Sequence, residues 1–200
     1  IGGLSSLIVV PIALLVGMGG GYFGRRIDDA VFFVITVLSS IPTLLLLIAL
    51  VMALGRGTLQ VCLALGITSW VGFSRVIRGE TLKLRELEYV QAAQAFGASA
   101  ARIMVRHILP NVMHIVLIAV VMDFSGLVLA EAVLSYIGIG VDPSTISFGT
   151  MINTARLELA REPVVWWSLV AAFAFMFVLV LAANLFSDAV RDAFDPRVAG

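Results

Sequence analysis

The sequence predicts an all-α integral membrane protein, and its composition and the length of its apolar segments lead to this fold class. Of the 200 residues, 60% are hydrophobic and 13% are charged, whereas a soluble domain carries about 25% charged residues. The mean hydropathy is +1.07. A helix of about 20 apolar residues crosses a hydrocarbon core of about 30 Å. We therefore expect a single transmembrane domain over residues 1–200.

The chain contains five apolar segments that are long enough to cross a membrane as helices. Two longer connections lie between these segments. A polar segment, 75–110, follows the third span, and residues 133–163 follow the fourth. We place the five spans near residues 1–22, 31–54, 58–77, 111–132 and 164–187.

Basic residues are concentrated in three of the connections. The first, third and last connections contain ten Lys and Arg residues, and the other two contain three. Connections rich in Lys and Arg remain in the cytoplasm. This distribution predicts a cytoplasmic polar segment, a cytoplasmic C-terminus and an external segment 133–163. Because the first span then starts outside, we expect at least one further helix upstream. The ten residues are Arg25, Arg26, Arg75, Arg78, Lys83, Arg85, Arg102, Arg106, Arg191 and Arg197, and the three are Arg56, Arg156 and Arg161.

The first span ends in a run of glycines between Gly17 and Gly24. A phosphate-binding loop needs Gly-Lys-Ser or Gly-Lys-Thr after such a run, but the first lysine of the chain is Lys83. The run therefore does not predict an ATP site. Glycine allows helix backbones to approach closely in a membrane, so we expect close helix packing here.

Pro42 lies in the middle of the second span, within Ser39-Ser40-Ile41-Pro42-Thr43. Proline removes one backbone hydrogen bond and kinks a helix. Carbonyl groups freed inside a membrane need new donors, and the neighbouring hydroxyl groups are available. Two interpretations stay open. The kink is purely structural, or it bends the helix around a translocation path, as broken helices do in transporters.

The polar segment contains the pattern of an amphipathic helix. Tyr89, Ala92, Ala93 and Phe96 are spaced i, i+3, i+4 and i+7, which places them on one face of an α-helix. Gly97 ends this helix, because glycine readily adopts the left-handed conformation that follows a helix end. The simplest interpretation of the whole segment is a solvated loop between two spans.

A second short helix is predicted after the glycine. Ser99 can cap its first turn, and the helix continues through Ile103 toward His107. Pro110 either stops this second helix or opens the next one, because its missing N–H costs little in a first helical turn.

Asp123 is the only acidic residue deep inside a predicted span. It lies about 18 Å along the helix axis from Asn111, near the middle of the membrane. We expect Glu131 to reach the outer interface. A carboxylate at the depth of Asp123 must face a polar cavity, have a partner or be protonated. It either lines a wet substrate path, where it meets a cation or a peptide amino group, or forms a structural hydrogen bond.

The sequence indicates no metal site, no disulfide and no enzymatic activity. His107 and His114 are seven residues apart, which separates them by about 10.5 Å along a helix, too far for one metal ion. Cys62 is the single cysteine, and we expect it to be a small buried side chain. No nucleophile, base and orienting group occur together.

Gln91-Ala92-Ala93, Gly97 and Leu109-Pro110 resemble the EAA loop of bacterial ABC-importer permeases. In that family a glutamate, two alanines, a glycine and a terminal Leu-Pro belong to the short helix and loop that couple the permease to its ATPase. Gln91 departs from the usual glutamate, so a salt bridge from this position is not expected in this chain.

Other segments resemble the dipeptide, oligopeptide and nickel branch of these permeases, and the resemblance extends from about residue 14 to residue 197. The segments are Gly21-Tyr22-Phe23-Gly24, residues 134–141, Phe148-Gly149-Thr150-Met151 and residues 191–197.

This resemblance implies a type I permease fold with a cytoplasmic coupling helix over residues 89–97, in a multi-pass protein of the bacterial inner membrane. It also implies a second homologous permease subunit, two ATPase subunits that hold ATP and magnesium, and an external solute-binding protein that delivers a peptide-like substrate. This chain itself would hold no cofactor, metal or nucleic acid. The implied coupling residues are Tyr89, Gln91, Ala92, Ala93, Phe96, Gly97, Leu109 and Pro110, and the candidate residues of the translocation path are Pro42 and Asp123.

Two other classes of function are considered beside an ABC permease. An ion-coupled secondary transporter is expected to contain several buried carboxylates or histidines, but Asp123 is the only deep one. A non-transporting membrane scaffold would use the same polar segment to recruit a cytoplasmic partner.

Overall fold

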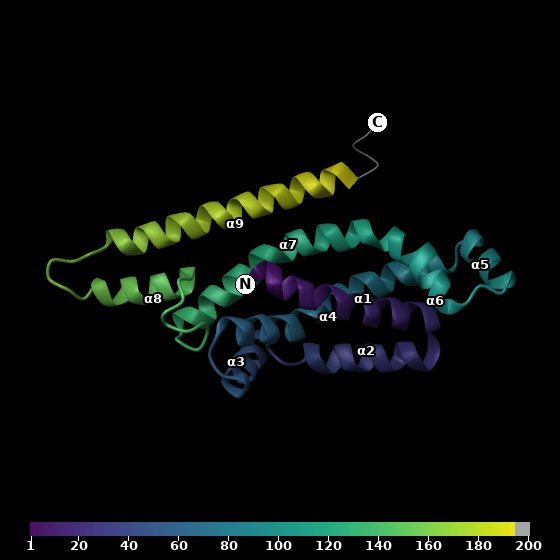
Figure 1. Cartoon of the computed structure of the whole chain (residues 1–200), viewed down its shortest axis with the longest axis horizontal. Coiled ribbons are helices and arrows are strands. Elements are labelled where there is room, and N and C mark those ends of the chain that lie inside the picture. The colour runs from purple at the N-terminus through teal and green to yellow at the C-terminus, as the bar shows by residue number, and fades with distance from the viewer. Residues whose placement is uncertain (195–200) are drawn as a thin grey trace.

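The structure, a computed structural model, describes residues 1–194 and is built from helices (Figure 1). No β-strand occurs in this range, so the predicted all-α class is confirmed. Part of the tail motif, Asp195-Pro196-Arg197, lies outside the described residues. The helices are α1 (Gly2–Phe23), α2 (Arg25–Ser39), α3 (Thr43–Leu54), α4 (Thr58–Arg85), α5 (Glu88–Ala95), α6 (Ala100–Ile103), the π-helical turn η1 (Met104–Ile108), α7 (Leu109–Tyr136), α8 (Phe148–Glu158) and α9 (Trp167–Phe194).

Within the described range, four helical segments are long and apolar enough to cross a membrane. Helices α2 and α3 meet the same requirement only as a pair, and they are bent by 88° at the break between them. The described residues therefore contain up to five candidate spans when this bent pair is counted as one. The four single segments are Gly2–Phe23, Thr58–Arg85, Ala100–Tyr136 and Trp167–Ala193.

The second predicted span is interrupted rather than kinked. Helix α2 ends at Ser39, and α3 begins at Thr43. Pro42 has a ψ of 122°, outside the helical region, and it has no N–H to donate. The hydroxyl group of Ser40 donates to the carbonyl group of Val37 at 2.7 Å, which satisfies one acceptor at the end of α2. Proline thus separates two helices that lie almost at right angles.

Helix α4 is longer than its apolar segment. The expected span ended at residue 77, but the helix continues to Arg85. The first part of the polar segment is therefore helical. Charged residues end an apolar segment, but they do not by themselves end a helix. Arg75 and Arg78 consequently lie within α4 and not in a loop.

The helix that carries Pro110 is continuous from Ala100 to Tyr136, 37 residues in all. Pro110 lies in the first turn of α7, where a missing N–H is tolerated. The turn before it is π-helical, and the amide of Leu109 donates to the carbonyl group of Met104, five residues earlier. Pro110 therefore does not stop the helical segment; it lies at the start of α7, which follows η1 without a break.

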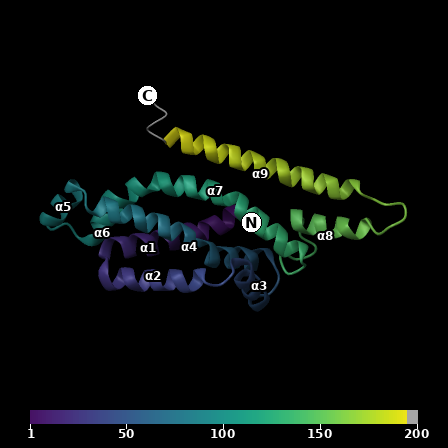
Figure 2. The same cartoon turned by 180° about the vertical axis from the view of Figure 1, so that it is seen from behind.

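Helix α1 lies along α4 (Figure 2), and glycines of α1 face α4. A Cβ atom added to Gly17 would stand 2.8 Å from the carbonyl oxygen of Ser74, and one added to Gly21 would stand 2.7 Å from the Cβ atom of Thr81. Both distances are shorter than real contacts of a Cβ atom, so only glycine allows this approach. The close packing predicted from the glycine run is confirmed.

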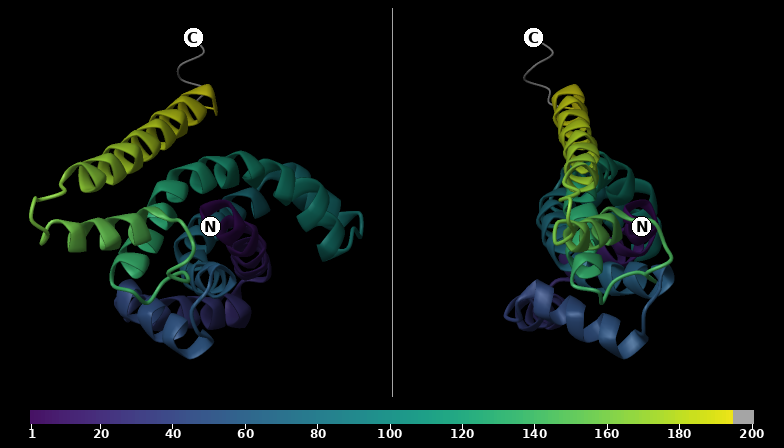
Figure 3. Two further views of the ribbon diagram at one scale, coloured as in Figure 1. Left: turned by 60° about the vertical axis from the view of Figure 1, so that its left-hand side comes forward. Right: turned by 90° about the vertical axis from the view of Figure 1, so that its left-hand side faces the viewer.

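The connections are grouped at two ends of the molecule (Figure 1). Helices α5 and α6 lie at one end of the bundle, and α3 and α8 lie toward the other. Helix α9 lies to one side of the bundle, next to α7 and α8 (Figure 3). Among its described side chains, only Ala172 and Ser187 are buried. The hydroxyl group of Ser125 in α7 donates to the side-chain carbonyl of Asn184 in α9 at 3.0 Å.

Candidate functional site

Helix α5 is a separate eight-residue helix between α4 and α6. It ends in a Schellman motif, in which the N–H of Gly97 donates to the carbonyl of Gln94 at 2.9 Å and the N–H of Ala98 donates to that of Ala93 at 3.0 Å. Gly97 has a φ of +77°, a conformation that favours glycine. Ser99 then caps the first turn of α6 with its side chain. The helix end at Gly97 and the cap at Ser99 are both as predicted.

Side-chain contacts hold α5 against the bundle. Val90 is completely buried. The hydroxyl group of Tyr89 accepts a hydrogen bond from the side-chain amide of Asn111 in α7 at 3.3 Å. The side-chain amide of Gln94 donates to the hydroxyl group of Tyr22 in α1 at 3.4 Å. These contacts tie α5 to two membrane-spanning segments.

The outward side of α5 is apolar. Phe96 is 91% exposed and Tyr89 is 45% exposed, and Ala92 is exposed between them. Ala93 differs from the sequence expectation. It lies three residues after the buried Val90 and packs against the same apolar core. The four residues that we expected on one face are therefore divided between an exposed side and the core.

Gln91 forms a contact that the usual glutamate of the EAA motif cannot form. Its side-chain amide donates to the backbone carbonyl of Glu86 at 3.2 Å. An ionised carboxylate has no proton to donate. Gln91 is itself exposed, as is Gly97. The glutamine therefore stabilises the turn between α4 and α5, and it presents no charge to the surroundings.

Leu109 and Pro110 lie at the start of α7 and not on α5. Leu109 packs against the core, and Pro110 is exposed. The ring of His107, just before them, lies with its centre 6.0 Å from that of Tyr89. The carbonyl of His107 also accepts a hydrogen bond from Asn111 at 2.6 Å. The predicted coupling residues thus form two groups, which Tyr89 joins.

A polar cavity of about 330 Å³ lies between the break of α2 and α3, helix α4 and helix α7. Asp123 lines it, as does Arg75, which lies where the expected third span, 58–77, overlaps the polar segment, 75–110. Pro42 is not a lining residue, although the side chains on both sides of the break are. The polar lining residues are Ser39, Thr43, Thr68, Ser69, Arg75 and Asp123.

Arg75 and Asp123 bring opposite charges to this cavity. The guanidinium group of Arg75 donates to the hydroxyl oxygen of Ser39 at 2.7 Å. Among the described residues, the carboxylate of Asp123 has no hydrogen-bond donor and no cationic partner. The structural hydrogen bond that we considered for Asp123 is therefore absent from this part of the chain.

Glu131, which we expect at the outer interface, is buried inside the protein. It is 4% exposed, and one of its carboxylate oxygens accepts a hydrogen bond from Ser135 at 2.6 Å. The hydroxyl oxygen of Ser135 in turn accepts from the N–H of Val141 at 3.2 Å. Glu131 therefore fixes the end of α7 to the segment that follows it. In that segment Ser144 donates through its hydroxyl and its amide to Asp142, which lowers the pKa of this exposed carboxyl.

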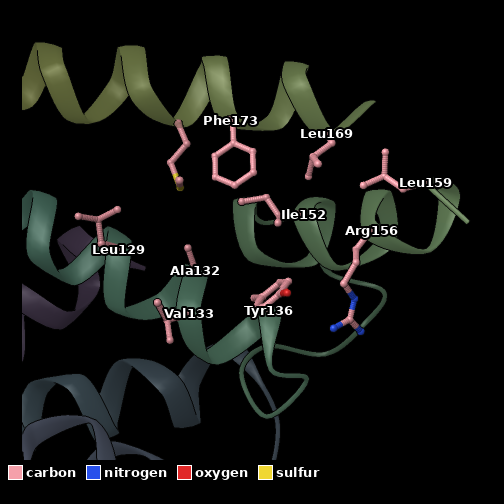
Figure 4. A pocket seen from close by; sticks show the side chains of 10 residues that line it. Leu129, Ala132, Val133, Tyr136, Ile152, Arg156, Leu159, Leu169 and Phe173 are labelled. Carbon is pink, nitrogen blue, oxygen red and sulfur yellow. The ribbon is translucent and has the colours of Figure 1, made fainter. Parts of the chain in front are cut away.

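A second pocket, of about 310 Å³, lies between α7, α8 and α9 (Figure 4). Leu129, Ile152 and Phe173 contribute to its apolar wall. Its charged residue is Arg156, whose guanidinium group lies 5.3 Å from the centre of the Tyr136 ring. This pocket lacks the paired charges of the polar cavity.

The described residues contain no group of three His, Cys, Asp or Glu side chains that could hold a metal ion. Cys62 is buried, as expected from the sequence. The candidate functional regions of the described chain are the exposed side of α5 and the polar cavity.

These helices have the fold of an ABC-importer permease. A chain in an inward-facing structure of the MetNI methionine ABC transporter matches 94% of this chain and 88% of its own length, with a TM-score of 0.63 and 19% sequence identity. This similarity shows the fold, which is the type I permease fold expected from the EAA motif.

The chain belongs to the family described as binding-protein-dependent transport system inner membrane component, whose family model matches residues 10–200. It is 33% identical over 198 residues to the dipeptide transport system permease protein DppC of Bacillus subtilis (strain 168), covering 99% of this chain and 61% of the relative. It is 32% identical over 198 residues to the oligopeptide transport system permease protein OppC of the same organism, covering 99% and 64%.

A third relative is the glutathione transport system permease protein GsiD of Escherichia coli O6:K15:H31 (strain 536 / UPEC). The identity is 36% over 179 residues, which covers 90% of this chain and 58% of the relative. The chain thus spans about three-fifths of the length of the curated relatives that it matches. The predicted membership of the peptide branch of ABC permeases is confirmed by these similarities.

Proposed function

We propose that this chain is the transmembrane permease subunit of an ATP-driven importer that moves peptides into the cell. Membership of the family and similarity to dipeptide and oligopeptide permeases over 99% of the chain support this function. ATP and magnesium are held by two separate ATPase subunits, and this chain is not itself an enzyme. A second, homologous permease subunit completes the translocation path.

The observation that carries the coupling mechanism is the exposed apolar side of α5. Phe96 is 91% exposed on a helix that Val90, completely buried, anchors to the bundle. Exposed aromatic side chains beside a small residue such as Ala92 suit a helix that lies in the groove of a partner protein. When ATP closes the two ATPase subunits, the groove moves α5, and the contacts of α5 with α1 and α7 transmit the motion.

The proposed orientation follows from the distribution of basic residues. The segment 75–110 and the C-terminus face the cytoplasm, where the ATPase subunits bind. The segment 133–163, which includes α8, faces outward and receives the solute-binding protein. Pro42 and Asp123 belong to the proposed path, since the break at Pro42 provides one side of the polar cavity that Asp123 lines.

Uptake measurements separate this function from the two alternatives. The full-length protein is reconstituted into vesicles with its partner permease, ATPase and binding-protein subunits, and labelled dipeptide is supplied with either ATP or an imposed proton gradient. We expect uptake with ATP alone. Uptake driven by the gradient without ATP indicates a secondary transporter, and no uptake under either condition indicates a scaffold.

The coupling role is tested by Ala92→Glu in the same assembly. A charge on the exposed side of α5 should reduce ATP-driven uptake about tenfold while the subunit remains inserted, because a carboxylate is poorly accommodated in an apolar groove. Ala101→Glu is the matched control, since Ala101 is also exposed but lies on α6. Unchanged uptake by Ala92→Glu would remove the coupling mechanism. Ala93→Glu is less suitable, because Ala93 also packs against the core.

A further inference from the structure

We propose that Arg75 and Asp123 form a binding site for a zwitterionic peptide, with the peptide carboxylate at Arg75 and its ammonium group at Asp123. This inference rests on the proposed function and adds to it the chemical class of the cargo and two residues that recognise it. The site is the polar cavity between the α2–α3 break, α4 and α7.

The wall that α4 contributes is polar and open. Thr68, Gly72 and Arg75 are spaced i, i+4 and i+7, so they lie on one face of the helix, and all three line the cavity. A Cβ atom added to Gly72 would meet no other atom within 4 Å. The volume of about 330 Å³ is at the small end of ligand pockets, which range over about 300–1,000 Å³. The space therefore suits a short peptide.

Asp123 differs from the other carboxylates inside the bundle because it lacks a partner. Asp28 accepts two hydrogen bonds from Arg78, and Glu131 accepts one from Ser135. Asp123 is half-buried, and among residues 1–194 its carboxylate has no hydrogen-bond donor and no salt-bridge partner. An ionisable group at this depth is costly unless something compensates it. A ligand ammonium group would supply the missing partner.

Arg75 has unused donors that face the same space. A guanidinium group offers five N–H donors, and within the described chain the hydroxyl oxygen of Ser39 is the single hydrogen-bond acceptor of Arg75. That acceptor is neutral, so the positive charge is not compensated. Arginine binds a carboxylate through two parallel hydrogen bonds. The free carboxyl end of a peptide is the group that fits this geometry.

Two hydroxyl groups on the cavity wall are also available to a ligand. The hydroxyl group of Thr68 donates to the carbonyl of Ala64 within its own helix. The side-chain hydroxyl groups of Thr43 and Ser69 have no hydrogen-bond partner in the described part of the chain. These two hydroxyl groups lie on different elements, α3 and α4. They provide donors and acceptors for the peptide bond of a bound dipeptide.

The positive charge of Arg75 and the negative charge of Asp123 together disfavour a ligand that is only cationic or only anionic. A simple cation compensates Asp123 but leaves Arg75 uncompensated, and a simple anion does the reverse. A peptide with free amino and carboxyl ends compensates both charges at once and adds no net charge to the membrane interior. The cavity therefore favours unblocked peptides over peptides that are blocked at either end.

The test uses the complete reconstituted transporter and three probes: dialanine, N-acetyl-dialanine and dialanine amide. Initial ATP-driven uptake is measured with saturating binding protein, and each variant is compared with the wild type, so the selectivity of the binding protein cancels. We expect Asp123→Asn to lower the preference for dialanine over N-acetyl-dialanine about tenfold and to leave the preference over the amide unchanged. Arg75→Gln should have the opposite pattern.

Two further variants keep the result interpretable. Arg75→Lys retains the positive charge and should retain most of the preference over the amide even if Arg75→Gln is poorly folded. Arg26→Gln removes an exposed arginine that does not line the cavity, and both preferences should stay at the wild-type values.

The proposal is overturned if Asp123→Asn and Arg75→Gln reduce the uptake of all three probes by the same factor, because the two charges would then act structurally. It is also overturned if Arg75→Lys loses the preference completely. A wild-type assembly that takes up no probe with ATP would overturn the proposed function, and this inference with it. A different result, ATP-driven uptake in which the Asp123 and Arg75 variants keep the wild-type preferences for dialanine, would refute the proposed binding site and leave the proposed function intact.

Discussion

Two arginines in α4 that lie one helical turn apart, Arg75 and Arg78, differ in the charge of their hydrogen-bond partners. Arg78 donates two hydrogen bonds to the carboxylate of Asp28 in α2 and lies 5.7 Å from the centre of the Phe32 ring. Arg75 donates to the neutral hydroxyl of Ser39 and faces the polar cavity. Two residues of the same type therefore differ in their partners: Arg78 has an anionic partner within the fold, whereas Arg75, the residue that we propose binds a ligand, has a neutral one.

The Arg78–Asp28 pair fixes α2 to α4 near the end of the bundle that carries α5. Its side chains retain 25% and 18% exposure, so both charges are largely removed from solvent. At the opposite end of α2, Ile35 and Leu38 belong to the apolar core. The polar contact with α4 at that end is the hydrogen bond from Arg75 to the hydroxyl group of Ser39. The first contact joins two opposite charges, whereas the second is a hydrogen bond to a neutral group, which contributes only about 1 kcal/mol.

The largest expected effect that tests this comparison is on stability. Arg78→Ala should lower the free energy of unfolding by about 3 kcal/mol, because it leaves the partly buried carboxylate of Asp28 uncompensated. Arg75→Ala should lower it by less than about 1 kcal/mol, since only a hydrogen bond to a neutral group is lost. Thermal unfolding of both full-length variants in detergent gives the two values. Equal losses would show that the two arginines are alike.

A pair of glycines gives the next largest effect. Gly21→Ala should destabilise the protein by about 2 kcal/mol, because the new Cβ atom would stand 2.9 Å from the carbonyl oxygen of Arg78 and closer to Thr81. Gly72→Ala should stabilise it by about 0.5 kcal/mol, since alanine favours a helix and the space is open. The same unfolding measurement compares them, and a destabilising Gly72→Ala would indicate that the cavity is closed.

Double-mutant cycles sharpen the comparison further. The coupling energy between Arg78 and Asp28 should be about 1.5 kcal/mol, because their side chains share two hydrogen bonds. The coupling energy between Arg75 and Asp123 in the absence of peptide should be close to zero. A substantial coupling for the second pair would mean that these residues bind each other instead of a ligand.

The smallest expected effect belongs to Ser39→Ala. Removal of this hydroxyl should cost less than about 1 kcal/mol, because Arg75 is exposed and water can replace the acceptor. Uptake of dialanine should remain within about twofold of the wild-type rate. A large loss of uptake without a loss of stability would instead make Ser39 part of the binding site.

Local signals in the sequence predicted the local structure of the segment around α5. Gly97 and Ser99 act on their nearest neighbours, so a helix end and a cap could be inferred from residue type. The apolar length of the spans likewise predicted the all-α membrane fold. The complete break at Pro42 was not predicted, because the orientation of α3 relative to α2 depends on packing with α4 and not on the proline alone.

The cavity could be predicted only in part. Asp123 was found because a carboxylate is conspicuous within an apolar segment. Arg75 was counted with the cytoplasmic connection and not with the translocation path, because it lies at the end of the third apolar segment, where charged residues begin. The pairing of these two residues across one space requires the relative placement of α4 and α7, which no spacing within the sequence encodes. Ala93 was similarly misplaced, since Val90 decides which side of α5 faces the core.

In the proposed mechanism, the helical segment from Ala100 to Tyr136, which includes the π-helical turn Met104–Ile108, acts as a lever that starts beside α5. Asp123 lies about 34 Å along this lever from Ala100, so a tilt of about 5° at its base displaces the carboxylate by about 3 Å. Arg75 lies in a different helix, α4, and is not displaced by the tilt of this segment. A small movement of α5 at the cytoplasmic side would therefore change the distance between the Arg75 guanidinium group and the Asp123 carboxylate. In the proposed mechanism, this change would convert a site that binds the peptide into one that releases it.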